Sequence, residues 1–126
     1  MKNTHAIVGV WFVKVANAPF PYHMFKFHAD GTMSQANPDA GDPRTSDSDG
    51  MGLWQANGHH IKGKFVEITA DRVTHTFVSR GEISFFITVE KDVFRGTWDA
   101  VFYDERGSVL QKLPTSAFEG KRIVLA

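Results

Sequence analysis

The sequence contains no cysteine, and this absence excludes disulfide bonds, thiolate nucleophiles and sulfur-ligated metal sites together. Long hydrophobic runs are missing as well: none approaches the roughly 18 apolar residues that a transmembrane helix requires. The first residues, MKNTHAIVGVW, lack the apolar segment that is typical of a signal peptide. We therefore expect a cytoplasmic protein without a membrane partner.

The chain also lacks an excess of charge of either sign, because 14 basic residues are balanced by 14 acidic ones. Residues 25–27 (FKF) and 62–65 (KGKF) place basic and aromatic side chains side by side, as single-strand nucleic-acid binders do. A zero net charge and the lack of a basic stripe nevertheless argue against such binding. We expect no nucleic-acid partner.

Recognisable metal and cofactor motifs are missing too. His59 and His60 are adjacent, so in a strand they would point in opposite directions. The aspartate-rich residues 38–50 lack both the Asp-x-Asp-x-Asp-Gly register and the glutamate of an EF-hand loop. No glycine-rich phosphate loop follows a predicted strand. We expect neither a metal nor a cofactor.

Residues 60–103 contain the clearest structural signal, an alternation of Val, Ile, Thr and Phe with a period of two. Short breaks at residues 71–72, 80–81 and 91–92 divide this stretch into four predicted strands, which is typical of an antiparallel meander. Links this short cannot make parallel crossovers. The other predicted strands cover residues 6–15, 22–29, 32–37, 51–56, 108–113 and 117–125.

About ten short antiparallel strands, with no segment of helical period, must protect their edges, and closing into a barrel does so. We therefore predict an all-β fold with one domain over residues 1–126. That domain would be an up-and-down antiparallel β-barrel of about 8–10 strands.

Gly9-x-Trp11 on the first predicted strand, with Arg122 near the end of the sequence, resembles a pairing found in the lipocalin and calycin superfamily. The resemblance implies that the arginine covers the indole ring and closes one end of the barrel by a cation–π contact. The helix-turn-helix of intracellular fatty-acid-binding proteins is missing, because only ANAPFP joins the first two strands. No histidine follows His75, so the proximal ligand of nitrobindin-like haem proteins has no counterpart. The resemblance then implies a small calycin-like barrel, a group that includes isomerases, cyclases and plain binders.

Eleven phenylalanines and three tryptophans are a large aromatic content for 126 residues. Such rings either pack as an ordinary core or line an apolar cavity, and the sequence leaves both open. If a cavity exists, the candidates for contact with a substrate are Trp54, Trp98, Phe86, Phe77 and His28. Trp98 shares a predicted strand face with Phe94 and Phe102, which favours an inward position. His28 follows a strand whose two faces are both mixed, so its direction stays open.

His75 and Glu67 are the candidate catalytic residues. Alternation places His75 on one face with Val73 and Phe77, and a histidine facing a cavity can exchange protons near neutral pH. Glu67 lies about as far before a turn near Asp71 as His75 lies after it, so the two would be cross-strand neighbours. A carboxylate beside a histidine raises the basicity of the imidazole. The alternative is an outward Glu67 with a core or exposed His75.

We favour a barrel that encloses a small hydrophobic or aromatic metabolite, and an enzyme over a carrier. Cofactor-free proton transfer would suit isomerisation, cyclisation or dehydration. Two alternatives remain: a non-catalytic, lipocalin-like ligand carrier, and a structural or interaction barrel with a filled interior. Edges beside residues 38–50 also leave a homodimer open.

Overall fold

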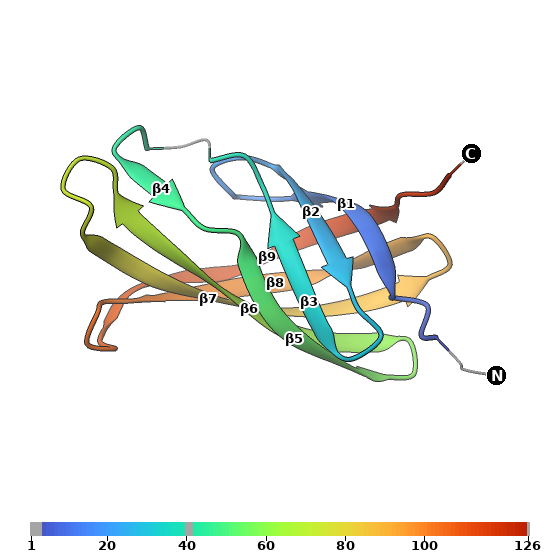
Figure 1. Ribbon diagram of the computed structural model, residues 1–126. Coiled ribbons are helices and arrows are strands. Elements are labelled where there is room, and N and C mark those ends of the chain that lie inside the picture. Colours follow the sequence, from blue (N-terminus) through green and yellow to red (C-terminus); the bar gives the residue numbers. More distant parts are fainter. Residues whose placement is uncertain (1–3, 40–41, 126) are drawn as a thin grey trace.

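The computed structural model describes residues 4–39 and 42–125, and this part of the chain contains strands and turns but no helix. It accordingly offers no helix with the length and apolarity needed to cross a bilayer. Figure 1 shows the nine strands: β1 (Gly9–Val15), β2 (Tyr22–Phe27), β3 (Thr32–Ala36), β4 (Thr45–Asp47), β5 (Gly50–Asn57), β6 (His60–Asp71), β7 (Phe77–Glu90), β8 (Val93–Tyr103) and β9 (Val109–Arg122).

The sheet closes on itself. Neighbours follow the order β4-β6-β5-β3-β2-β1-β9-β8-β7, and an antiparallel β6–β7 pairing joins the two sides. Eight strands form an up-and-down barrel, and β4 adds a short ninth segment that pairs with the end of β6. The predicted all-β barrel is confirmed. A closed antiparallel barrel is consistent with a lipocalin-like fold but not specific to it.

Aromatic side chains dominate the interior. Strand alternation turns Phe25, Phe27, Phe85, Phe94 and Phe118 inward, and each is at most 5% exposed. Phe25 is central to the cluster, with ring centroids 5.9 Å from both Phe85 and Phe118. Most of these ring pairs are tilted or edge-to-face, the arrangements that aromatic quadrupoles prefer. Large rings thus fill much of the barrel.

Arg122 closes one end of the barrel over Trp11. Its guanidinium carbon lies 4.4 Å from the centre of the indole ring, and its Nη1 donates a 2.8 Å hydrogen bond to the carbonyl of Val8. Trp11 is fully buried and donates its indole N–H to the carbonyl of Ile7. Glycine suits position 9 because its φ is 139°, a conformation that other residues rarely adopt, and a Cβ there would also lie 2.7 Å from Arg122 Nη1. The cation–π contact implied by the resemblance is therefore present.

The predicted break at residues 80–81 is wrong. Strand β7 runs without interruption from Phe77 to Glu90, and the chain reverses before it at residues 72–76, beside the predicted break at residues 71–72. Gly81 is not a turn residue: a Cβ there would lie 2.9 Å from the ring of Phe102, so its missing side chain makes room for that ring. Asp71 forms the real turn, because its carboxylate accepts the backbone N–H groups of Val73 and Thr74.

The two predicted closing strands are a single strand, β9, which runs from Val109 to Arg122 through Pro114. The pairing with β8 shifts between the Trp98–Ser116 and Ala100–Leu113 partners. Such a bulge accommodates a proline without ending the strand. Residues 4–39 and 42–125 accordingly form nine strands, where about ten were predicted.

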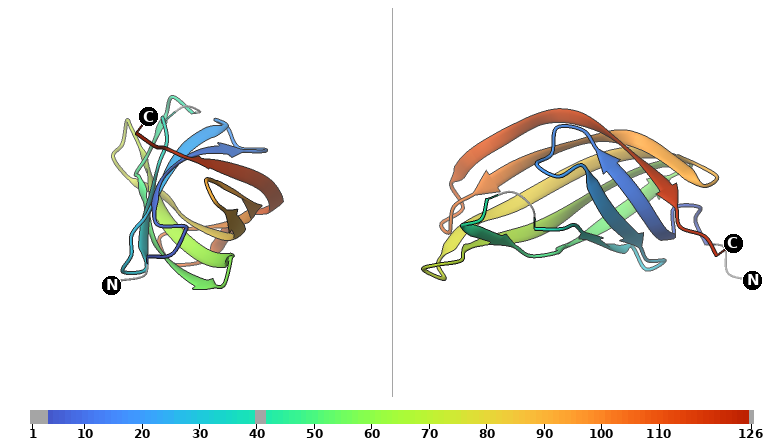
Figure 2. Two further views of the ribbon diagram at one scale, coloured as in Figure 1. Left: turned by 90° about the vertical axis from the view of Figure 1, so that its right-hand side faces the viewer. Right: turned by 90° about the horizontal axis from the view of Figure 1, so that it is seen from above.

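The strands differ in length, and this difference leaves one end of the barrel open. Strands β6 to β9 span 12, 14, 11 and 14 residues, whereas β1 to β3 span only 7, 6 and 5. In Figure 2 the long strands extend well beyond the short ones. The end opposite the Trp11–Arg122 contact therefore lacks a complete wall.

Candidate ligand cavity

A cavity of about 770 Å³ lies at this incomplete end. Its floor is apolar and is formed mainly by Phe25, Phe65, Ile83, Phe85, Trp98 and Phe118. Its rim is polar and includes Asn17, His23, Asn37, Asp39, Asp42, Asp47, Glu67, Thr69 and Gln111, and the buried Gln35 lines the cavity as well. An apolar floor with a few polar groups is the usual composition of a small-molecule site.

Two glycines flank Glu67 in the barrel wall, and a phenylalanine ring covers each of them. Gln35 on β3 pairs with Gly50 on β5, and the pairing of the next residues brings Gly50 level with Glu67 on β6. On its other side Glu67 pairs with Gly81. A Cβ at Gly50 would lie 2.4 Å from the nearest ring atom and one at Gly81 would lie 2.9 Å from it, so each glycine makes room for a ring beside Glu67.

A hydrogen-bond network fixes the orientation of the Gln35 amide. Its Nε2 donates to Asn37 Oδ1 at 2.6 Å and to His23 Nδ1 at 3.1 Å. His23 in turn donates its Nε2–H to the carbonyl of Phe20 at 3.0 Å. Burial lowers the pKa of His23, in keeping with the neutral tautomer that accepts at Nδ1. The Gln35 oxygen is thereby directed away from these partners.

Two buried polar atoms in the cavity wall have no hydrogen-bond partner: Gln35 Oε1, an acceptor, and Trp98 Nε1, a donor. Gln35 is only 1% exposed and Trp98 9%. A buried polar atom without a partner costs about 1–3 kcal/mol. Such atoms are uncommon in folded proteins, and a ligand that pairs with both would remove the cost.

Burial raises the pKa of Glu67 to about 7, and the nearby carboxylate of Asp47 adds to the effect. Desolvation disfavours the charged form, and a second negative charge disfavours it further. Near neutral pH, Glu67 therefore populates both its acid and its carboxylate forms. It is a proton donor and acceptor at the edge of an apolar cavity.

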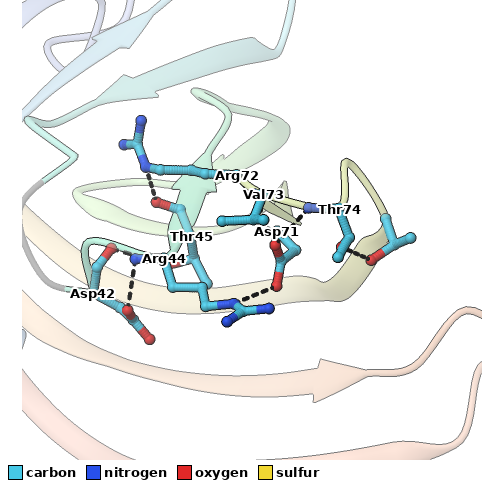
Figure 3. A network of polar contacts seen from close by, with 8 residues as sticks. Asp42, Arg44, Thr45, Asp71, Arg72, Val73 and Thr74 are labelled. Carbon is cyan, nitrogen blue, oxygen red and sulfur yellow. Dashed lines mark hydrogen bonds and ion pairs between the residues drawn. The ribbon is translucent and has the colours of Figure 1, made fainter.

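Polar contacts hold the segment around β4 against the β6–β7 turn (Figure 3). Arg44 forms an ion pair with Asp71 at 2.9 Å, and Arg72 donates a hydrogen bond to the carbonyl of Thr45. Hydrogen bonds from the turn backbone and from Arg44 hold the pKa of Asp71 well below its usual range. Beside this network, Thr69 donates to Asp47 at 2.6 Å, which positions that carboxylate at the rim.

Among the predicted catalytic residues, Glu67 lines the cavity but His75 does not. His75 lies in the β6–β7 turn with a φ of 60°, is exposed, and donates its backbone N–H to the carbonyl of Asp71. The expectation that Glu67 and His75 are cross-strand neighbours is wrong, because Glu67 pairs with Gly81. The turn uses residues 72–76, which the alternating pattern had assigned to a strand.

Of the predicted aromatic contacts, Trp98 lines the cavity and the others lie elsewhere. Trp54 and His28 meet away from it, near the β2–β3 turn, where the indole N–H donates to the His28 carbonyl. Phe77 begins β7 and is 36% exposed. Phe86 faces outward, is 59% exposed, and lines a separate surface groove of about 470 Å³.

Sequence reasoning did not single out His23, Gln35 and Asp47 as site residues. His23 alternates with Phe25 and Phe27, both of which point inward. The sequence did not show which face of β2 points inward, so His23 could not be assigned to the cavity. Gln35 alternates with the buried Met33. A single amide on an inward strand face is unusual, and this pattern could have indicated a polar group in the cavity. Asp47 joins the site only because β4 pairs with the end of β6.

Among residues 4–39 and 42–125, no three His, Asp or Glu side chains are grouped closely enough to hold a metal ion. Comparisons with protein-family models, curated proteins and solved structures found no match to this chain.

Proposed function

We propose that the protein binds a small, largely apolar or aromatic molecule in the 770 Å³ cavity. The body of the ligand would contact the phenylalanine floor, and its polar end would meet Gln35 and Trp98. The aromatic surface supplies most of the affinity, since burial of apolar area yields roughly 25 cal/mol per Å². The polar atoms fix the orientation of the ligand.

The observation that carries this proposal is the pair of buried atoms without partners, Gln35 Oε1 and Trp98 Nε1. A barrel that served only as a scaffold would gain stability by replacing both with apolar groups. An acceptor and a donor in one cavity suit a ligand that offers a donor and an acceptor of its own. The closed end, by contrast, is filled with side chains.

Isothermal titration calorimetry with naphthalene-based probes, such as 1-naphthalenemethanol, tests the proposal. We expect saturable one-to-one binding. Gln35→Met removes the amide group and Trp98→Phe removes the indole N–H, and each should weaken binding about tenfold, equivalent to about 1.4 kcal/mol. Phe86→Leu on the outer groove is the matched control and should leave binding unchanged. A barrel that binds none of a broad panel of apolar and aromatic probes would instead be a structural or interaction module.

A second candidate function is cofactor-free proton transfer, and the pKa of Glu67 near 7 favours it. As a carboxylate, Glu67 would remove a proton from carbon beside a carbonyl whose oxygen accepts from Trp98 Nε1. As an acid, it would return that proton to a different carbon, which completes an isomerisation without a co-reactant. His75 is exposed in its turn, so we assign it no part in this scheme.

A β,γ-unsaturated cyclic ketone, whose conversion to the conjugated isomer is followed by absorbance, tests this second function. Loss of the base in Glu67→Gln should slow turnover by about 100-fold or more. His75→Ala should leave turnover unchanged, and the rate should rise as the pH passes about 7. Equal rates for the wild-type protein and Glu67→Gln would leave a carrier as the remaining function.

A further inference from the structure

The ionisable residues that line the cavity are strongly asymmetric in sign. Asp39, Asp42, Asp47 and Glu67 all line it, whereas no lysine or arginine does among the residues that the structure describes. The chain as a whole is neutral, with 14 basic and 14 acidic residues, so this local asymmetry is not a consequence of composition. Carboxylates of one sign at the mouth of a low-dielectric cavity attract cations and repel anions.

Nearby cations compensate little of this negative charge. Arg72 forms an ion pair with Asp39, and Arg44 is paired with Asp71, which does not line the cavity. Within the described part of the chain, no ion pair reaches Asp42, Asp47 or Glu67. Burial is the main cause of the raised pKa of Glu67, and the carboxylate of Asp47 raises it further.

An independent observation inside the cavity agrees with this charge pattern. Gln35 Oε1 is a buried acceptor without a partner, and Gln35 lines the same cavity as Glu67. An acceptor of this kind requires a hydrogen-bond donor from the ligand. An ammonium group brings up to three N–H donors and no acceptor, so it can serve Gln35 and a carboxylate at the same time. The phenylalanine and tryptophan rings of the floor add favourable contacts with a cation.

We propose that the cavity selects organic ammonium ligands, an amino group on an apolar or aromatic body, over neutral and anionic ligands of the same shape. Gln35 Oε1 and Glu67 receive the ammonium group, and Asp47 at the rim adds attraction. A hydroxyl or carbonyl elsewhere on the ligand accepts from Trp98 Nε1. This inference rests on the proposed function, because it specifies the ligand class of the same cavity.

Three naphthalene probes that differ only in their polar group provide the test: 1-naphthylmethylamine, 1-naphthalenemethanol and 1-naphthaleneacetate. Calorimetric titrations at pH 7.5 and fixed ionic strength compare their affinities. We expect the amine to bind at least about tenfold more tightly than the alcohol, and the carboxylate to bind more weakly than both. The advantage of the amine over the alcohol should shrink as salt is added.

Variants that remove one negative charge identify the residues responsible for the preference for the amine over the alcohol. Asp47→Asn and Glu67→Gln should each reduce the affinity for the amine by about threefold to tenfold and leave the affinity for the alcohol nearly unchanged. Glu90→Gln removes one exposed carboxylate at the far end of β7 and is the matched control, which should alter neither affinity. Asp47 lies at the exposed end of β4, so its variant should fold even if Glu67→Gln does not.

The affinity for the amine should also rise between pH 5.5 and pH 8, since ionisation of Glu67 creates the partner charge. The other ionisable groups that face this site are His23 on β2, Asp39 and Asp42 before β4, and Asp47 on β4. Protonation of His23 at low pH would weaken cation binding in the same direction. The affinity for the alcohol should not follow this profile.

Equal affinities for the amine and the alcohol, or tighter binding of the carboxylate, would overturn the ammonium preference and leave the proposed ligand cavity intact. Loss of alcohol and amine binding by the same factor in both charge-removing variants would also overturn it. No saturable binding of any of the three probes would overturn the ligand cavity and the ammonium preference together.

Discussion

Glu67 pairs with Gly81 across the β6–β7 ladder, and the ring of Phe102 covers that glycine. A Cβ at position 81 would lie 2.9 Å from Cε1 of Phe102. Gly50 is level with Glu67 on the other strand, and a Cβ there would lie 2.4 Å from the ring of Phe65. The barrel wall on both sides of Glu67 thus depends on glycines that make room for aromatic rings.

Alanine at the two glycine positions should destabilise the protein unequally. A Cβ at position 50 would lie 2.4 Å from Cδ1 of the buried Phe65, whereas a Cβ at position 81 meets the partly exposed Phe102 ring at 2.9 Å. Forcing a buried ring aside costs about 1–3 kcal/mol, so Gly50→Ala should lie at the upper end of that range and Gly81→Ala at the lower. Urea denaturation measures both, and the reverse order would contradict this account of the wall.

The stability of the protein should fall as the pH rises from about 4.5 to about 7 because of Glu67. The pKa of Glu67 is higher in the folded state than in the unfolded chain, so the folded state binds the proton more tightly. The protonated carboxyl therefore stabilises the folded state, and this contribution is lost on deprotonation. The effect is on the order of 3 kcal/mol if the whole shift is realised. Glu67→Gln should remove this dependence and raise the stability above pH 7. Urea denaturation at pH 4.5, 6 and 8 tests it, and parallel profiles for both proteins would show that the carboxyl is solvated.

Arg122 should contribute far more to stability than its neighbour Lys121. It covers Trp11 at 4.4 Å, donates to the Val8 carbonyl, and forms a 2.8 Å ion pair with Asp92. Replacing Arg122 with alanine removes the cation–π contact and leaves the carbonyl without its donor, a loss of about 3 kcal/mol in total. Lys121→Ala, at an exposed position on the same strand, should change the free energy of unfolding by less than about 0.5 kcal/mol. Similar losses in the two variants would mean that Arg122 does not close the barrel.

Asp71→Asn should loosen the β6–β7 turn and the attached β4 segment without unfolding the barrel. The carboxylate accepts the backbone N–H groups of Val73 and Thr74 and pairs with Arg44, so its loss affects both sides of the contact. Hydrogen exchange should become faster in residues 45–47 and 71–76, with no change at Phe94. The variant should also lose less stability on acidification below about pH 4, because the depressed pKa of Asp71 no longer contributes. Uniformly faster exchange throughout the barrel would contradict this local role.

The sequence by itself determined the fold class and the closed end of the barrel. Period-two alternation and short turns specify antiparallel neighbours because they are local properties of the chain. Gly9, Trp11 and Arg122 were recognisable because their pattern resembles a pairing found in the lipocalin and calycin superfamily, in which an arginine covers the indole.

Only the tertiary structure decided which polar side chains share the cavity. Glycine has two uses, a turn and a close approach, and at Gly81 alternation alone could not distinguish a strand that ends from one that continues beside Phe102. Because of that ambiguity, the prediction placed His75 in a strand. In the structure His75 lies in the exposed turn, whereas Glu67 lines the cavity. Gln35 and Glu67 are 32 positions apart, and the register of β3, β5 and β6 places them in one cross-strand row. Register is set by long-range pairing, and one residue of slip reverses the face of every side chain.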